Sequence, residues 1–89
     1  KHGRGTMYYK NNDVYEGWWN KNMREGVGTH FYTNGDKYYG EWKINKKNGQ
    51  GLFHKNNGEK FIGNFKDDKK HGIGQSIGLN NEKITEEWK

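Results

Sequence analysis

The four histidines are the residues with the most distinctive potential chemistry, because a neutral imidazole binds zinc and exchanges a proton near neutral pH. A zinc site needs about four ligands that converge on one point, most often Cys, His or carboxylate side chains. The chain has no Cys, and its histidines lie far apart along the sequence: His2, His30, His54 and His71. We therefore expect no metal site and assign these histidines surface or turn-stabilising roles.

The other reactive side chains do not form a catalytic set. Ser76 is the single serine of the chain, and no Ser or Thr stands in a strained glycine turn that would activate a hydroxyl nucleophile. Asp67 and Asp68 are flanked by lysines, which is typical of a solvated turn. Gly-x-Gly occurs at 26–28, but no helix follows it that could bind phosphate. We predict no catalytic residue and no cofactor here, while a catalytic domain elsewhere in a longer chain stays open.

The composition is polar but rich in aromatic residues. Only 28% of the 89 residues are hydrophobic and the mean hydropathy is -1.47, yet 16% are aromatic, which disordered segments usually lack. No apolar run approaches the roughly 20 residues of a membrane-spanning helix. The sequence opens on Lys1 inside a repeat, so we expect it to be part of a longer protein. We expect an intracellular protein of the cytoskeleton, a cilium or the cytoplasmic face of a membrane.

The elements that would position any site repeat every 23 residues. Two aromatic or aliphatic positions recur at this spacing, and thirteen of the fourteen glycines fall at four positions of the same period. The first series is Tyr15, Tyr38, Phe61 and Ile84, and the second is Trp19, Trp42, Phe65 and Trp88. We predict that these eight residues form the core of the repeat.

Each repeat is predicted to be a β-hairpin. Residues 38–42 alternate aromatic and polar side chains, as a strand does, and 27–33 is a second strand-like segment. Asn34-Gly35 between them predicts a two-residue type I′ turn. This turn would pair Phe31 with Tyr38 and Val27 with Trp42, put Thr29 and Gly40 on their face, and place Gly28 opposite Glu41. Successive hairpins would be joined by six-residue loops at 20–25, 43–48 and 66–71.

The predicted fold class is therefore all-β, an extended antiparallel meander of stacked hairpin repeats in a single-layer twisted sheet. One hairpin cannot bury its aromatic stripe alone, so the repeats must stabilise one another. We divide the chain into a partial repeat at 1–14, repeats at 15–37, 38–60 and 61–83, and the start of a further repeat or a cap at 84–89.

The repeat resembles the MORN (membrane occupation and recognition nexus) motif, whose pattern is roughly Y-x-G-x-W-x-x-G-x-x-H-G-x-G. The chain reads YEGWWNKNMREGVG from Tyr15, YYGEWKINKKNGQG from Tyr38 and FIGNFKDDKKHGIG from Phe61. It departs from the pattern where Asn22, Asn45 and Asp68 replace the loop glycine. The resemblance implies a scaffold of cytoskeletal, ciliary or membrane-junction assemblies, often a dimer. It leaves open an accessory role in a lysine methyltransferase or a phosphoinositide kinase.

Two surfaces are candidate binding sites. Four aromatic residues outside the repeated positions would share one face and bind a protein partner, or else cover strand glycines: Trp18, Tyr32, Tyr39 and Phe53. Eight basic residues fall in the predicted six-residue loops and could contact anionic phospholipid, or simply suit exposed loops: Lys21, Arg24, Lys43, Lys46, Lys47, Lys66, Lys69 and Lys70. The net charge of +5 also permits nucleic acid, which we consider an improbable partner without a recognised nucleic-acid module.

Overall fold

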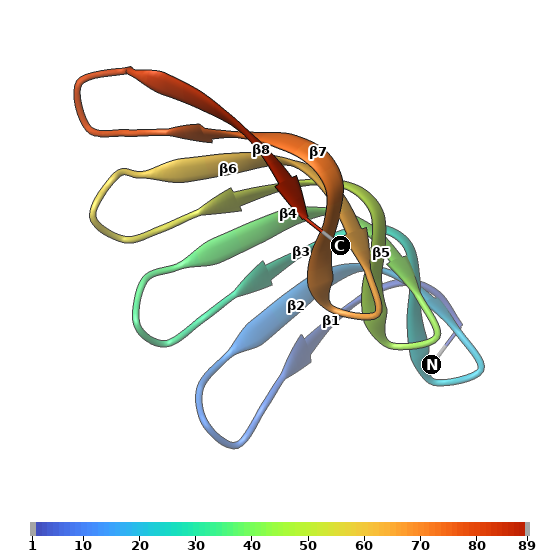
Figure 1. The fold of residues 1–89 in the computed structure, drawn as a ribbon. Helices are drawn as coiled ribbons and strands as arrows, with labels where there is room; N and C mark the ends of the chain where they lie inside the picture. Colours follow the sequence, from blue (N-terminus) through green and yellow to red (C-terminus); the bar gives the residue numbers. More distant parts are fainter. Residues whose placement is uncertain (1, 89) are drawn as a thin grey trace.

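The chain folds into one open sheet of eight antiparallel strands that follow one another in sequence order (Figure 1). The computed structural model describes residues 2–88. Its strands are β1 (Gly3–Tyr8), β2 (Val14–Asn20), β3 (Met23–Phe31), β4 (Lys37–Lys43), β5 (Lys46–His54), β6 (Lys60–Lys66), β7 (Lys69–Ile77) and β8 (Lys83–Trp88). No helix that could cross a membrane occurs among these residues. The predicted all-β meander of hairpins is confirmed.

The turns that contain Asn and Gly have three residues rather than two. The N–H of Gly35 donates to the carbonyl of Tyr32, and the N–H of Tyr32 donates to the carbonyl of Asp36, both at 3.0 Å. Gly35 has a φ of 93°, whereas Asn34 stays outside the positive-φ region. This geometry is a type I turn followed by a left-handed residue, which adds one residue to the loop. The prediction of a type I′ turn at Asn34-Gly35 is therefore wrong.

The longer turn shifts the register of the hairpin by one residue. Phe31 pairs with Lys37, and His30 pairs with Tyr38. A shift of one residue moves every side chain of a strand to the other face of the sheet. The predicted placement of Val27, Thr29 and Phe31 beside Tyr38 is therefore wrong, and Val27 and Phe31 are exposed on the opposite face.

The predicted six-residue loops are instead the two-residue turns of the structure. β2 ends at Asn20 and β3 begins at Met23, and both residues between them have positive φ, as a type I′ turn requires. The same turn recurs at Ile44-Asn45 and Asp67-Asp68. Asn and Asp replace the motif glycine here because they tolerate the left-handed conformation. We call this side of the sheet the type I′ edge.

A row of seven glycines crosses the sheet where the predicted pairing had put Gly28 opposite Glu41. Gly28 instead pairs with Gly17 on one side and Gly40 on the other. The row runs through every strand but the last, where Glu86 takes the position: Gly5, Gly17, Gly28, Gly40, Gly51, Gly63 and Gly74. A Cβ on Gly40 would lie 2.6 Å from the Tyr38 hydroxyl. The bare backbone therefore makes room for the tyrosine ring.

The aromatic rings above this row form a continuous ladder of edge-to-face contacts. Tyr15 meets Trp19 of its own repeat at 5.0 Å between centroids and Trp42 of the next repeat at 5.3 Å. Tyr38 repeats the pattern with Trp42 at 5.2 Å and Phe65 at 5.0 Å. Such contacts contribute about 0.5–1.5 kcal/mol each beyond the burial of apolar area. Every second step of the ladder thus couples neighbouring repeats.

Hydrogen bonds fix the rings of the first two complete repeats. The Tyr15 hydroxyl donates to the carbonyl of Trp18, and the indole N–H of Trp42 donates to the carbonyl of Gly28, both at 3.1 Å. In the third repeat, Phe61 and Phe65 carry no polar atom that could form these bonds. The ladder therefore continues there through ring contacts alone.

The sheet is bent along its strands, so that its ring-bearing face is concave. Figure 1 shows the strand ends near the type I′ edge turned down relative to the longer arms. The bend coincides with the glycine row and with register shifts between Gly17 and Trp19 and between Gly40 and Trp42. β-Bulges increase local bending and twist. We call the concave face the groove and the convex face the outer face.

Candidate functional site

The groove is lined by a second layer of half-buried rings above the ladder. Tyr9, Tyr32 and Phe53 pack against the buried core residues. His30 is 7% exposed, stacks on Tyr9 with ring centroids 5.8 Å apart, and contacts the tilted ring of Tyr32 at 4.3 Å. At the end formed by β1 to β4, Tyr9, His30 and Tyr32 occupy the groove.

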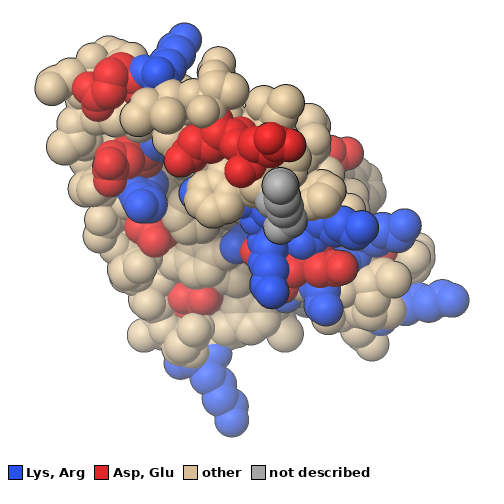
Figure 2. All heavy atoms as spheres, viewed as in Figure 1, with Lys and Arg blue, Asp and Glu red and all other residues tan. Residues whose placement is uncertain are grey.

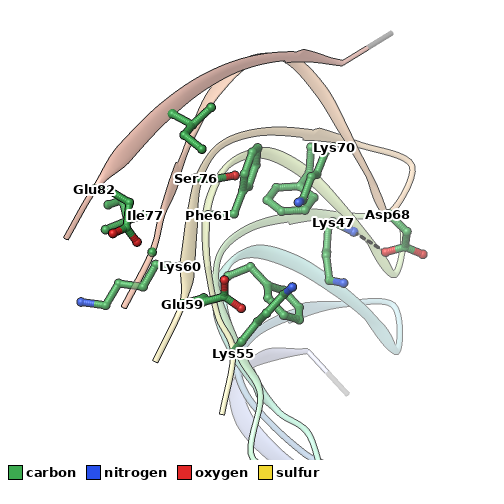
Figure 3. A pocket seen from close by; sticks show the side chains of 14 residues that line it. Lys47, Lys55, Glu59, Lys60, Phe61, Asp68, Lys70, Ser76, Ile77 and Glu82 are labelled. Carbon is green, nitrogen blue, oxygen red and sulfur yellow. Dashed lines mark hydrogen bonds between the residues drawn. The ribbon is translucent and has the colours of Figure 1, made fainter. Parts of the chain in front are cut away.

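The groove becomes an open cavity toward β7 and β8 because large side chains give way to small or flexible ones. One repeat position is filled by Tyr9 and Tyr32 in the first repeats, but by Lys55 and then Gly78 in the later ones. Ser76 likewise takes the repeat position of His30 and Phe53. The result is a cavity of about 400 Å³ with an apolar floor that includes Phe61 and Phe65 (Figure 3).

Three cations at one repeat position turn into the groove over the rings. Arg24 lies 4.6 Å from the centroid of Trp42, and Lys70 lies 4.2 Å from Phe61 and 4.8 Å from Trp88. Cations within about 6 Å of a ring face are attracted by its quadrupole. The row therefore adds positive charge to an aromatic surface.

Lys47, the middle member of this row, lies among four rings. Its Nζ is 5.4 Å from the centroids of Tyr38 and Phe53, 5.5 Å from Tyr32 and 5.9 Å from Phe65. The chain thus supplies its own cation to an aromatic cage whose rings come from three successive repeats. The backbone of Lys47 is held as well, because its N–H donates to the Asp68 carboxylate at 2.9 Å.

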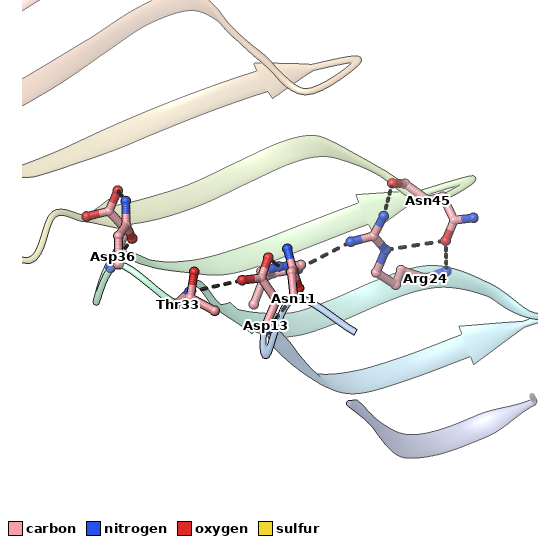
Figure 4. Close-up of polar contacts among 8 residues, drawn as sticks. Asn11, Asp13, Arg24, Thr33, Asp36 and Asn45 are labelled. Carbon is pink, nitrogen blue, oxygen red and sulfur yellow. Dashed lines mark hydrogen bonds and ion pairs between the residues drawn. The ribbon is translucent and has the colours of Figure 1, made fainter. Parts of the chain in front are cut away.

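Turn residues hold the repeats together at both edges of the sheet (Figure 4). On one edge, the Asp13 carboxylate accepts the N–H of Thr33 at 2.9 Å, and Asp36 accepts that of Asn56 at the same distance. On the type I′ edge, the Asn45 side chain accepts the N–H of Arg24 at 2.8 Å. These bonds link positions about 20 residues apart, so they fix one repeat against the next.

His30 is the centre of a polar chain inside the groove. Its Nε2 lies 3.0 Å from Asp13, and its Nδ1 lies 3.3 Å from a guanidinium nitrogen of Arg24. Because Arg24 can only donate, we assign Nδ1 as the acceptor and place the proton of a neutral imidazole on Nε2, where it is donated to Asp13. A neutral His30 satisfies both neighbours.

Burial and hydrogen bonding shift the pKa values of this cluster. Burial lowers the pKa of His30, and the hydrogen bond to Asp13 opposes that shift. The hydrogen bond from His30 is the main cause of the lowered pKa of Asp13. Burial also raises the pKa of Tyr15 to about 12. The pair is therefore an aspartate with a neutral histidine at pH 7.

Family comparison agrees with the repeat. The model of the MORN repeat matches residues 1–14, 15–37, 38–60 and 61–78. The chain belongs to the MORN repeat family. MORN arrays are non-catalytic repeat modules that bind proteins or membranes. No curated protein matches the chain.

The MORN fold divides the eight predicted basic residues between two places. Arg24, Lys47 and Lys70 turn into the groove and are half-buried. The other five are exposed at the type I′ edge: Lys21, Lys43, Lys46, Lys66 and Lys69. Figure 2 shows Lys and Arg side chains gathered over the region where Figure 1 places this edge. The eight basic residues therefore do not lie on one surface.

The prediction that the four candidate aromatic residues share one face is wrong. Trp18 and Tyr39 are exposed on the outer face, with 47% and 54% of their surfaces accessible. Tyr32 and Phe53 lie in the groove against the core. The one-residue register shift explains the division, because it moves the residues of β3 and β5 to the face opposite the predicted one.

The predicted repeat core is buried except at the last strand. Six of the eight residues are at most 6% exposed, whereas Ile84 and Trp88 are 59% and 37% exposed. β8 has no partner strand on its outer side among residues 2–88.

Sequence reasoning missed the role of His30. It was treated as a surface or turn residue, but the structure buries it beside Asp13. The length of the loop around Asn34-Gly35 is the sequence feature that could have indicated this burial. A three-residue reading of 33–35 would have placed His30 opposite Tyr38 and inside the groove. Within residues 2–88, no three metal-ligating side chains converge on one point.

We predict that mild acidification destabilises the fold through His30. The pKa of His30 is lowered from its ordinary value of 6.5 in the folded state. The unfolded chain therefore binds more protons just below pH 6.5, and the stabilisation by neutral His30 is lost as the pH falls through this window. The midpoint of urea unfolding should decrease between pH 7.5 and 5.5. In His30→Gln, which keeps a donor and an acceptor, the decrease should be smaller; an equal decrease in both proteins would contradict the assignment.

Proposed function

We propose that this MORN array is a non-catalytic docking module whose groove binds a segment of a partner protein. The observation that carries the proposal is the groove itself. It combines half-buried rings, a row of cations and an open cavity on one concave face. Binding surfaces are enriched in Tyr, Trp, Phe and Arg, and the groove presents the first three of these together with Arg24.

The ladder supports a scaffold role. Because Tyr15, Tyr38 and Phe61 each contact a ring of the next repeat, the array is a continuous stack that could present the groove in a fixed shape. Eight strands in sequence order, at a spacing of about 4.8 Å, give the groove a length of roughly 34 Å, room for a partner segment of about 10 extended residues. The resemblance to MORN arrays favours a cytoskeletal, ciliary or membrane-junction assembly, and a homodimer is compatible with this role.

The docking proposal can be tested by one pair of matched substitutions. Peptides that bind the chain would first be selected from a random 16-residue display library. Tyr32→Ser removes a groove ring and Tyr39→Ser removes an outer-face ring, so the chemical change is the same. We expect Tyr32→Ser to weaken the selected peptides at least tenfold and Tyr39→Ser less than twofold, measured by fluorescence anisotropy. Unfolding midpoints would control for loss of fold, and a larger effect of Tyr39→Ser would contradict a groove site.

A second candidate, contact with an anionic membrane, is favoured by the type I′ edge. Five lysines are exposed there against two exposed carboxylates, Asp67 and Asp68. Each basic residue near an anionic surface contributes about 1 kcal/mol. This charge lies at the rim of the sheet, so a membrane could contact it without entering the groove.

The membrane candidate predicts a charge effect confined to this edge. Lys46→Glu/Lys69→Glu should reduce sedimentation with phosphatidylserine-containing vesicles at least tenfold. Lys10→Glu/Lys37→Glu makes the same change of charge at exposed positions away from this edge and should reduce it much less. Equal reductions would indicate a response to net charge alone and would remove the type I′ edge as a membrane site.

A further inference from the structure

The cavity between β5 and β8 is an open space with apolar walls, whereas rings of the chain occupy the rest of the groove. Its walls include Phe53, Phe61, Ile77 and Ile84, which come from four different strands. Its volume of about 400 Å³ falls in the range of sites that bury small molecules or anchoring side chains. In the first repeats the corresponding space is occupied by rings of the chain itself.

The lining of the cavity carries four lysines and three carboxylates. Lys47, Lys55, Lys60 and Lys70 all line it. Within residues 2–88, none of these ammonium groups pairs with a carboxylate; the ion pair of the described chain is His30 with Asp13. A ligand that brought carboxylates to the cavity would therefore find cations that are not already paired.

The three carboxylates are Asp68, Glu59 and Glu82, and the first two already accept hydrogen bonds within the chain. Asp68 accepts the backbone N–H of Lys47, and Glu59 accepts the side-chain N–H of Asn57 at 2.8 Å. Both carboxylates thus serve turns of the sheet. Figure 3 shows Lys47 and Lys55 extending into the cavity, whereas Lys60 points away from it.

We propose that this cavity captures a bulky apolar side chain from an acidic segment of a partner protein, with Lys47 and Lys55 pairing to carboxylates that flank it. The apolar floor takes the side chain, and the two lysines select for the acidic flanks. This proposal rests on the groove being a protein-docking site and adds the chemistry of the partner. An extended peptide fits better than a membrane, because the apolar floor lies inside a concave face.

The probe is a set of labelled 12-residue peptides built from Gly, Ser and Glu around one central Phe. One control peptide replaces the Phe with Ala, and a second replaces every Glu with Lys. We expect the acidic Phe peptide to bind at least tenfold more tightly than either control, measured by fluorescence anisotropy at 0.15 M salt. Equal binding of the three peptides would overturn the proposal.

Variants of the chain locate the site. Gly78→Tyr should block the cavity, because it restores the residue type found at Tyr9 and Tyr32 and pushes the Glu82 side chain out of the place that the new Cβ takes. It should weaken binding of the acidic Phe peptide at least tenfold. Ser76→Phe fills the same space from a neighbouring position and is the alternative if Gly78→Tyr fails to fold. Lys55→Glu should weaken binding at least tenfold, while Lys60→Glu, with the same charge change on a side chain that points away, should weaken it less than threefold.

The outcomes separate this proposal from the docking function. Peptides selected from the random library that need Tyr32 but ignore Gly78→Tyr and Ser76→Phe would overturn the cavity proposal and leave the groove as a docking site. Vesicles of phosphatidylcholine with phosphatidylserine that bind the chain, lose binding with Gly78→Tyr and compete with the peptide would reassign the cavity to lipid. Loss of peptide binding in Lys55→Glu and Gly78→Tyr, with unchanged unfolding midpoints, would support the proposal that the cavity binds an apolar side chain from an acidic segment.

Discussion

The contact between an aromatic ring and a bare glycine backbone is the constraint on which the rest of this structure depends. A Cβ on Gly51 would lie 2.6 Å from the Cζ atom of Tyr38, and its other close neighbours are atoms of the same ring. Without a side chain on this row, the ring can lie on the backbone and reach the ring of the next repeat. The row therefore allows a single-layer sheet to bury a core of six rings, although only 28% of the chain is hydrophobic.

The same constraint explains why the chain has a groove. The rings occupy one face, and the sheet bends around them at the glycine row and the bulges. A bent sheet with a filled floor leaves a concave surface above it. What that surface presents then depends on the few positions that vary between repeats. Tyr9 and Tyr32 close the groove at one end, whereas Gly78 and Ser76 open it at the other.

The sequence predicted the repeat, the all-β meander and the aromatic positions because all three depend on period alone. A spacing of 23 residues identifies equivalent positions whatever their exact pairing. Register was not predictable in the same way. Asn34-Gly35 is compatible with a two-residue or a three-residue turn, and a single residue decides which face His30 and Phe31 occupy.

The candidate site was less predictable because it depends on register and on contacts across repeats. Arg24 and Lys47 could be read as exposed loop cations only while the loops were taken to be long. Once the turns shorten to two residues, both side chains belong to strands and point over rings. The pairing of His30 with Asp13 joins positions 17 residues apart, and no local pattern in the sequence indicates it. The cavity arises because Gly78 and Ser76 have no large side chain where other repeats have a ring. The 23-residue spacing shows that these two positions differ from their equivalents, but it does not show that a cavity results.

The central claim is that the rings require bare glycine beneath them, and a double-mutant cycle between Tyr38→Leu and Gly51→Ala tests it most directly. The free energy of unfolding would be measured in urea for the parent chain, both single variants and the double variant. We predict that Gly51→Ala destabilises the parent by about 1–3 kcal/mol, because the methyl group overlaps the Tyr38 ring. In the Tyr38→Leu background the same change should be neutral or stabilising, since Ala is favoured over Gly within a strand by about 0.5–1 kcal/mol. Additive effects of the two substitutions would contradict the account.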